Sequence, residues 1–171
     1  MQQDKQGELK IPFEFERQLY FMVKLQGIEQ VLKHSEFLHE SWVSLCDPEG
    51  ARGDVDWTTY LQKIIHFATA PDSCGVTFLV QSKNQKNIGA FVLQEDTDSS
   101  NKKTIAVYSG FSNEKDAMLP RAAWAFMRQY SKQMGFVEMH AQSRRLSGAA
   151  MRFFRQKLGM KPVAMVFSID L

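Results

Sequence analysis

The sequence has few cysteines and no long apolar segment, and both features narrow what the protein can be. Its two cysteines, Cys46 and Cys74, form no CxxC pair and show no spacing typical of metal ligands. A reduced, cytoplasmic protein is therefore expected, and a single disulfide is the alternative. No apolar run has the length needed to cross a bilayer, and the N-terminus lacks the apolar core of a signal peptide. We expect no membrane partner.

Internal repeats and low-complexity tracts are also absent from the sequence. With 171 residues and 44% hydrophobic content, the chain is long enough for one domain with its own core. The first ten residues are mostly polar and predict a flexible N-terminal tail. The sequence thus predicts a tail over residues 1–10 and a single domain over residues 11–171.

Hydrophobic periodicity predicts the elements of the N-terminal half. Apolar and polar residues alternate over 11–25, which predicts a strand with room for a break near residues 12–17. A helical period covers residues 28–45. A second one covers 57–68, with Asp54 or Asp56 as its N-cap. Two further strands, at 75–81 and 88–94, are joined by a polar turn and predict a hairpin.

The C-terminal half alternates strands and helices. A strand–helix–strand unit of this length favours a parallel pair of strands with a right-handed crossover. Gly135 is placed to end the crossover helix. The expected elements are a strand at 104–109, a turn at 109–113, a helix at 116–134, a strand at 136–141, a helix at 146–158 and a strand at 163–171.

The expected order of elements is therefore β, α, α, β, β, β, α, β, α, β. We predict an α/β fold with a mixed, mostly antiparallel central sheet, one parallel βαβ crossover and helices on both faces.

This order and a few local patterns resemble the GNAT superfamily of acyl-coenzyme A dependent N-acyltransferases. The segment 88–92 resembles the third strand of that family, where a glycine, here Gly89, commonly lies. The late helix resembles the family patterns N-x-x-A-x-x-F-Y and K-L-G-F, with one extra residue between Phe154 and Lys157. The resemblance implies a GNAT-like fold, acetyl-coenzyme A as cofactor without a metal, and direct transfer of an acetyl group to an amine.

The cofactor loop departs from the family pattern. After the fourth strand the family usually has R/Q-x-x-G-x-G/A, whose backbone N–H groups approach the pyrophosphate. Residues 111–118 contain no glycine, and Glu114 and Asp116 place carboxylates where a diphosphate would lie. Pro120 removes one more backbone donor. Helix capping is the alternative role for these polar residues. If coenzyme A binds, the resemblance implies contacts from Phe111, Ser112, Asn113, Lys115, Ala117, Arg121, Arg144 and Arg145.

The proton donor is a second departure. Many members of the family protonate the leaving thiolate with a tyrosine on the late helix. The corresponding residue here is Phe154, or Arg155 if the extra residue is placed differently, and neither supplies a proton. Tyr108, on the fourth strand, is the nearest candidate, and a structural role as a half-buried strand aromatic is the alternative.

A transferase also needs a general base, because an ammonium nucleophile must lose a proton before it attacks. Glu138 and His140 are two residues apart on one predicted strand, so their side chains point the same way. We therefore predict Glu138, His140 and Tyr108 as catalytic residues. A solvated Glu–His pair is the alternative for the first two.

Positive charge is concentrated late in the chain. Residues 121–161 contain nine basic residues against one acid, Glu138, which favours an anionic partner. Arg144 and Arg145 follow the strand directly and are best placed to contact a ligand. The nine are Arg121, Arg128, Lys132, Arg144, Arg145, Arg152, Arg155, Lys157 and Lys161.

Two classes of function follow. The first is an acyl-coenzyme A dependent N-acyltransferase that acts on an amine, and the second is a catalytically inactive GNAT-like protein with a structural or interaction role, for example in a phage particle. The loop without glycine and the absent tyrosine favour the second class, whereas the strand–helix–strand core and the basic region favour the first. Fold alone does not decide between them.

Overall fold

The structure is a computed structural model that describes residues 2–3, 8–45, 55–71, 74–97, 103–113, 118–141 and 152–161. The strands are β1 (Gln2–Gln3), β2 (Leu9–Phe15), β3 (Gln18–Lys24), β4 (Gly75–Gln81), β5 (Asn87–Thr97), β6 (Lys103–Ser112) and β7 (Glu138–Ala141). The helices are α1 (Gly27–Lys33), α2 (Ser35–Leu45), α3 (Trp57–Thr69) and α4 (Met118–Gln133), with a π-helical turn η1 (Phe153–Lys157).

Within the described residues, the seven strands form one sheet in chain order, from β1 to β7. Neighbouring strands are antiparallel except for β6 and β7, which are parallel and pair from Thr104–Glu138 to Val107–Ala141. Helix α4 connects these two strands. The predicted mixed sheet with one parallel crossover is therefore confirmed.

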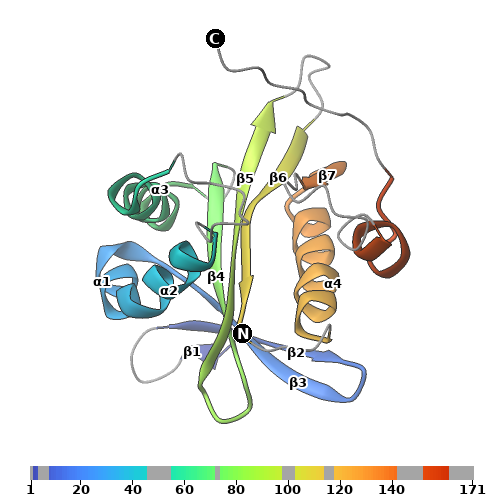
Figure 1. Cartoon of the computed structure of the whole chain (residues 1–171), viewed down its shortest axis with the longest axis horizontal. Coiled ribbons are helices and arrows are strands. Elements are labelled where there is room, and N and C mark those ends of the chain that lie inside the picture. The colour runs from blue at the N-terminus through green and yellow to red at the C-terminus, as the bar shows by residue number, and fades with distance from the viewer. Residues whose placement is uncertain are drawn as a thin grey trace.

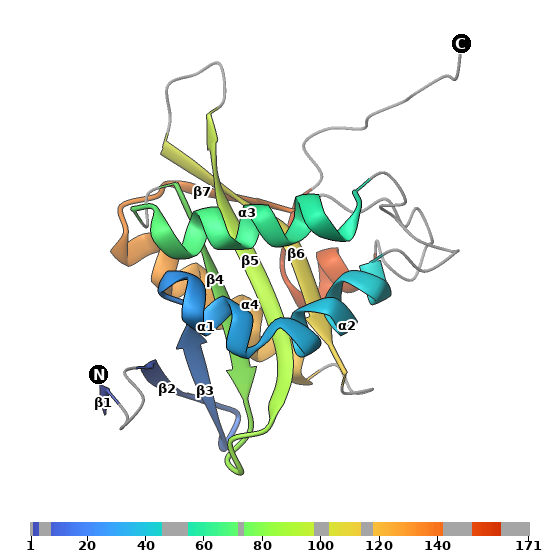
Figure 2. The ribbon, with the colours of Figure 1, turned by 90° about the vertical axis from the view of Figure 1, so that its left-hand side faces the viewer.

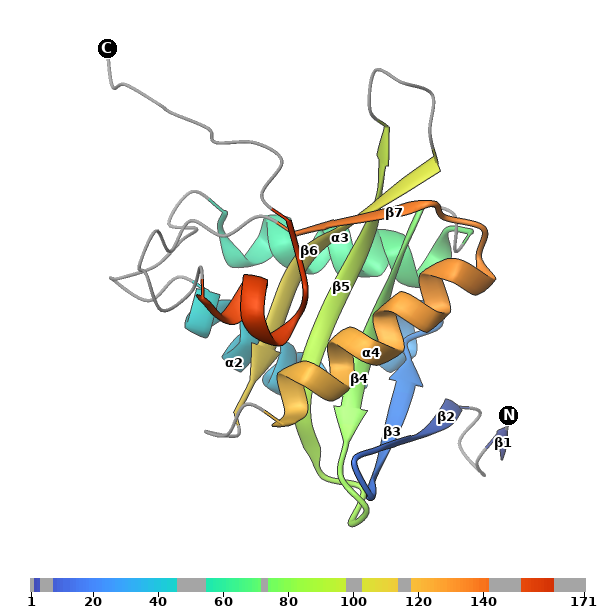
Figure 3. The same cartoon turned by 90° about the vertical axis from the view of Figure 1, so that its right-hand side faces the viewer.

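The sheet lies between two layers of helix (Figure 1). Helices α1, α2 and α3 cover one face, as Figure 2 shows, and α4 covers the other, as Figure 3 shows. Each face has its own core, because β4 and β5 send alternate side chains to the two sides. Leu79 and Val92 pack with α3 on one side, and Phe78 and Phe91 pack with Phe126 of α4 on the other.

The first predicted strand is two strands. β2 and β3 form an antiparallel hairpin in which Phe15 pairs with Gln18. The two turn residues, Glu16 and Arg17, have φ angles of 48° and 68°. Positive φ at both positions is typical of the tight turns that match strand twist, which usually contain Asn or Gly. The sequence shows neither residue here, so its alternation reads as one long strand.

The first predicted helix is also divided. Residues 28–45 form α1 and α2, which are separated at His34, where the backbone leaves the helical region. The backbone N–H of His34 still donates to the Gln30 carbonyl oxygen, which closes α1. Helix α3 begins as expected, since the Asp56 carboxylate accepts a hydrogen bond of 2.9 Å from the Thr59 backbone N–H.

The crossover unit consists of β6, α4 and β7. Its helix and its second strand agree with the prediction, but the predicted turn after its first strand does not. Residues 109–112, expected to form a turn, continue β6. Helix α4 ends at Gln133, and Gly135 follows with a φ of 79°, a conformation that glycine adopts without strain.

The N-terminal end of the chain differs from the prediction, and part of the C-terminal end lies outside the described residues. Residues 9 and 10, assigned to a flexible tail, belong to β2, and residues 2 and 3 form β1. Of the predicted late helix, residues 152–158 are described, and five of these form η1. The predicted strand at 163–171 lies outside the described residues.

Candidate functional site

Three polar side chains lie side by side on one face of the sheet, across β5, β6 and β7. Glu138 and His140 of β7 point away from the α4 side, where Met139 between them packs. Asp96 of β5 reaches the same face two strands away. The His140 ring lies 3.3 Å from an Asp96 carboxylate oxygen through Nδ1 and 3.3 Å from a Glu138 carboxylate oxygen through Nε2. The predicted pair is therefore brought together and extended by a third residue.

Asp96 lies beside His140 because β5 is longer than predicted. The predicted strand ended at residue 94, but β5 continues to Thr97 and pairs Asp96 with Thr104. The buried Thr104 hydroxyl donates to the Asp96 carbonyl oxygen, which fixes that end of the strand. His140 lies opposite Ala106 on β6, and this small residue leaves room for the ring to approach Asp96. Only the strand pairing reveals this contact.

The hydrogen-bond pattern sets the role that His140 can play. A carboxylate only accepts hydrogen bonds, so both contacts of the ring are hydrogen bonds when both ring nitrogens carry a proton. The Glu138 side chain is 44% exposed. Asp96 and Glu138 thus flank the His140 ring, and which of Glu138 and His140 acts as a base stays a prediction.

Tyr108 lies on the same face, one step further along β6. The register of β5 and β6 changes here: Val92 pairs with Ser109 and Leu93 with Val107, so β6 has one extra residue at Tyr108. Such a bulge bends the strand and redirects a side chain. The Lys63 ammonium of α3 lies 3.7 Å from the centre of the Tyr108 ring. Tyr108 is thus two residues along β6 from Ala106, the residue that pairs with His140.

A buried row of hydroxyl groups supports the bulge from the α3 side. The Tyr60 hydroxyl lies 3.3 Å from the Ser109 hydroxyl and 3.5 Å from the Ser41 hydroxyl. The Tyr60 ring also stacks on the Tyr108 ring, with centroids 6.4 Å apart. These contacts join α2, α3 and β6, and they hold the backbone of the bulge in place.

Half of the predicted cofactor contacts lie outside the described residues, and the predicted contacts stay predictions. Lys115, Ala117, Arg144 and Arg145 lie outside the described residues, as do Glu114 and Asp116. The Phe111 ring packs against Phe37 at 5.7 Å, and the Asn113 backbone N–H donates to the Ile88 carbonyl oxygen at 3.1 Å. Ser112 is the last residue of β6.

Arg121 is not directed at an open site. Its guanidinium forms an ion pair with Glu16 of the β2–β3 turn and lies 5.5 Å from the Phe15 ring centre. Of the other basic residues of the late region, those that the structure describes are exposed: Arg128, Lys132, Arg152, Arg155, Lys157 and Lys161.

The prediction places the phosphates of a nucleotide cofactor between the end of β6 and the start of α4. Helix α4 begins at Met118, and its first turn contains no acidic residue. The dipole of a helix favours anions at its N-terminus, although Pro120 supplies no backbone N–H. Gly89 fits closely beneath this end, because a Cβ there would lie 2.9 Å from the Phe111 carbonyl oxygen and 3.2 Å from Leu119 Cδ2.

The described residues show neither a metal site nor a membrane span. Across the described ranges, no three His, Cys, Asp or Glu side chains are placed to hold a metal ion. No helix in those ranges has the length and apolarity needed to cross a membrane.

Comparison by structure relates this chain to acetyltransferases. Aminoglycoside N-acetyltransferase AAC(6′)-Iy in complex with CoA matches with a TM-score of 0.65 and 13% identity, over 89% of this chain and 94% of that one. A ribosomal-protein-alanine N-acetyltransferase from Brucella melitensis matches with a TM-score of 0.61 and 10% identity, over 89% and 99% of the two chains.

An aminoglycoside acetyltransferase from a soil metagenomic sample, in complex with sisomicin, gives a TM-score of 0.60 at 13% identity, over 89% of this chain and 96% of that one. No protein-family model matches the sequence, and no curated protein matches it. At these identities the likeness concerns the fold, which is that of the GNAT acetyltransferases.

Proposed function

We propose that this chain, built on the GNAT fold, is an acyl-coenzyme A dependent N-acyltransferase that transfers an acetyl group to an amine. The observation that carries the proposal is the row Asp96, His140 and Glu138 on the sheet face beside the β6 bulge. The fold also supports the proposal, since structures with a similar fold include an acetyltransferase in complex with CoA.

Glu138 takes the proton of the acceptor amine, directly or through a water. Its carboxylate is half-exposed and can be reached by a substrate. His140 donates to it and is itself held by Asp96, so the carboxylate is oriented before the amine arrives. The two carboxylates also attract a cationic amine, which loses one proton to Glu138 and becomes nucleophilic.

The bound thioester supplies the acyl group, and the reaction exchanges a C–S bond for a C–N bond. With a thioester bound, the Tyr108 hydroxyl or solvent would supply the proton for the departing thiolate, because position 154 is a phenylalanine. Lys63 and Tyr60, both of α3, contact the Tyr108 ring. Transfer is direct, without an acyl-enzyme on cysteine.

The phosphate end of the cofactor would meet residues 111–113 and the first turn of α4. The helix N-terminus favours an anion, and the first turn from Met118 adds no repelling carboxylate. Arg121 would contribute only after release from Glu16.

The proposal is tested by steady-state release of coenzyme A thiol from acetyl-coenzyme A across a panel of amines. Glu138→Gln is expected to reduce the rate by about 10² to 10⁴, the usual contribution of a positioned base. Tyr108→Phe reduces it less, because solvent can replace the hydroxyl. Glu95→Gln is the matched control: this neighbouring carboxylate points to the opposite face of β5 and should leave the rate unchanged.

A non-catalytic protein with this fold is the second candidate, and the Arg121–Glu16 pair favours it. Arg121, a cation that would be needed to bind the phosphates of a cofactor, is paired instead with Glu16 of the same chain. Thiol release at the buffer rate with every amine would support this candidate and contradict the transferase.

A further inference from the structure

The outer side of α4 and residues 152–161 lie next to each other on the side of the sheet away from α1, α2 and α3 (Figure 3). The indole N–H of Trp124 in α4 donates to the Leu158 carbonyl oxygen at 3.1 Å, which joins the two segments. Arg128 and Lys132 follow Trp124 by one and two helical turns, so they extend the same side of α4 beyond this contact. The two segments thus form one surface.

This surface, which we call the basic face, exposes only three kinds of residue. As far as the structure describes them, the exposed positions of α4 and of residues 152–161 are cations, glutamines and one glycine. They include six positive charges, and no carboxylate or large apolar side chain is among them. The exposed residues of the basic face are Arg128, Gln129, Lys132, Gln133, Arg152, Arg155, Gln156, Lys157, Gly159 and Lys161.

This part of the chain contains few carboxylates that could neutralise the basic face. Between Asp116 and Asp170 the sequence contains one acid, Glu138, and β7 directs its side chain to the other side of the sheet. Among the described residues, none of the six cations lies within ion-pair distance of a carboxylate. The positive charge of the basic face is therefore available to a partner.

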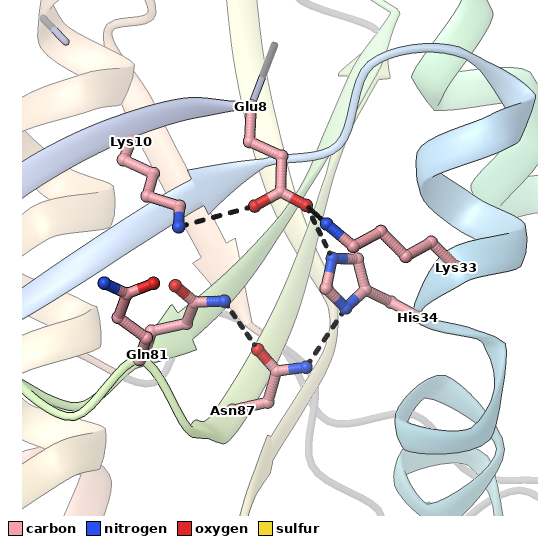
Figure 4. Close-up of a pocket in the computed structure, with 7 residues that line it drawn as sticks. Glu8, Lys10, Lys33, His34, Gln81 and Asn87 are labelled. Carbon is pink, nitrogen blue, oxygen red and sulfur yellow. Dashed lines mark hydrogen bonds and ion pairs between the residues drawn. The ribbon is translucent and has the colours of Figure 1, made fainter. Parts of the chain in front are cut away.

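Cations that stabilise the fold differ from these six, because they are paired. Lys10 and Lys33 contact the buried Glu8 carboxylate, which His34 also contacts at 3.2 Å (Figure 4). Burial alone would raise the pKa of Glu8, but the hydrogen bonds from Lys33 and His34 outweigh it and hold the pKa below its usual range. Within the described residues, no comparable contact accounts for the cations of the basic face.

The composition of the basic face distinguishes between classes of anionic partner. A protein interface usually has an apolar or aromatic centre, and a helix that binds a membrane surface has apolar residues beside its cations. A surface for single-stranded nucleic acid exposes aromatic rings on which bases stack. The described part of the basic face exposes none of these. Arginine, lysine and glutamine are instead typical of contacts to the phosphates and sugars of a duplex.

The basic face also extends beyond the proposed cofactor site. The phosphates of acetyl-coenzyme A would meet the first turn of α4, which begins at Met118. Arg128 and Lys132 are further along the helix by roughly 15 and 21 Å. Their charge therefore points to a second anionic partner.

We propose that the basic face binds the phosphate backbone of a nucleic-acid duplex without reading its sequence. The arginine and lysine side chains neutralise phosphates, and the glutamine side chains donate to phosphate or sugar oxygens. DNA and RNA duplexes share this chemistry. The binding does not depend on the proposed transfer of an acetyl group.

Fluorescence anisotropy of a short labelled duplex tests the proposal on the whole chain. Two duplexes of unrelated sequence should bind equally well, with dissociation constants of about 10⁻⁴–10⁻⁶ M at physiological salt. The logarithm of the association constant should fall linearly with the logarithm of the salt concentration, with a slope of about −2 to −5 for two to six neutralised phosphates. Separate titrations with DNA and RNA duplexes show which of the two binds more tightly.

Arg128→Gln combined with Lys132→Gln tests the place of binding. Glutamine already occupies neighbouring exposed positions of α4, so the helix should be retained. Loss of two phosphate contacts should make the salt slope shallower by about 1.8 and weaken duplex binding about tenfold at low salt. Lys83→Gln combined with Lys86→Gln is the matched control, because it removes the same charge from the exposed β4–β5 turn. It should leave the affinity and the slope close to those of the wild type.

Three competitors separate a duplex from other anions: coenzyme A, poly-glutamate and phosphatidylserine vesicles. None should displace the duplex at equal charge concentration, because a duplex carries one charge per roughly 1.7 Å of its axis and its phosphates accept paired hydrogen bonds from arginine. Displacement by coenzyme A would assign these cations to the cofactor site. Displacement by poly-glutamate or by vesicles would indicate an acidic protein or a lipid surface. Each of these results would overturn the proposal.

Absence of saturable duplex binding at low salt would also overturn it, and so would a wild-type salt slope in the Arg128 and Lys132 double variant. An equal loss of affinity in the Lys83 and Lys86 control would contradict the placement on the basic face. The salt series and the competitions use the wild-type chain, so they remain decisive even if a variant does not fold. Since none of these measurements involves thiol release, they are independent of the transferase assay.

Discussion

Asp96 and His140 are 44 residues apart in the chain, yet a carboxylate oxygen of one lies 3.3 Å from Nδ1 of the other. The contact crosses β6 and joins the end of β5 to β7. It gives His140 two carboxylate partners, Asp96 and Glu138, and in the proposed reaction Glu138 is the proton acceptor.

Asp96→Asn tests this arrangement. An asparagine oxygen still accepts from the ring, but without charge it stabilises the doubly protonated imidazole less well. We expect kcat for thiol release to fall about tenfold, less than for loss of Glu138 itself, with an unchanged KM for acetyl-coenzyme A. A purely structural role would instead lower stability and leave kcat unchanged.

Glu8 predicts a pH dependence of stability. Its pKa is lowered in the folded protein, so its contribution is present above the unfolded value of about 4.3 and is lost as pH falls through the folded value. Glu8→Gln should lower the free energy of unfolding by about 1–3 kcal/mol at neutral pH. The difference from wild type should shrink below about pH 4. Urea denaturation at several pH values measures it.

The control for Glu8 is Glu14→Gln, which changes an exposed carboxylate of β2. It should leave stability nearly unchanged. A Glu8→Gln effect that stays constant down to low pH would show that the carboxylate charge is not the source of the stability.

Gly89 is required by packing. Gly89→Ala would place Cβ 2.9 Å from the Phe111 carbonyl oxygen, and the β6 backbone cannot move as a flexible side chain would. We expect a loss of about 1–3 kcal/mol in the free energy of unfolding, measured by chemical denaturation. Gly110→Ala, where nothing lies within 4 Å of the added atom, should change it by less than about 0.5 kcal/mol. Equal effects would contradict this account.

The Arg121–Glu16 ion pair predicts a gain of function. Glu16→Gln releases Arg121, and coenzyme A should then bind roughly threefold tighter if this guanidinium contacts its phosphates, because an exposed pair is worth about 0.2–1 kcal/mol. Glu14→Gln is again the control. No difference between the two variants in a calorimetric titration would remove Arg121 from the cofactor site.

The sequence predicts much of this fold because the signals are local. The apolar stripe of α4, the end of that helix at Gly135 and the alternation in β4 and β5 each lie within one segment. Together they predict the parallel β6–β7 pair. The β2–β3 turn was missed because Glu16 and Arg17 adopt positive φ without the usual asparagine or glycine.

The candidate sites were harder to predict because they depend on pairing between distant strands. Glu138 and His140 share a strand, so their spacing was enough to place them together. Asp96 lies in a segment that resembles a polar loop, and only its register opposite Thr104 brings it to His140. Glu8 likewise resembles a residue of a solvated tail, and its burial depends on Lys33 and His34 of another element.

The central claim is that this protein binds an acyl-coenzyme A cofactor. Isothermal titration of the whole chain with acetyl-coenzyme A tests it most directly, without knowledge of the acceptor amine. The account predicts saturable binding of one molecule per chain. Heats no larger than those of dilution, at protein concentrations sufficient to detect millimolar affinity, would contradict it.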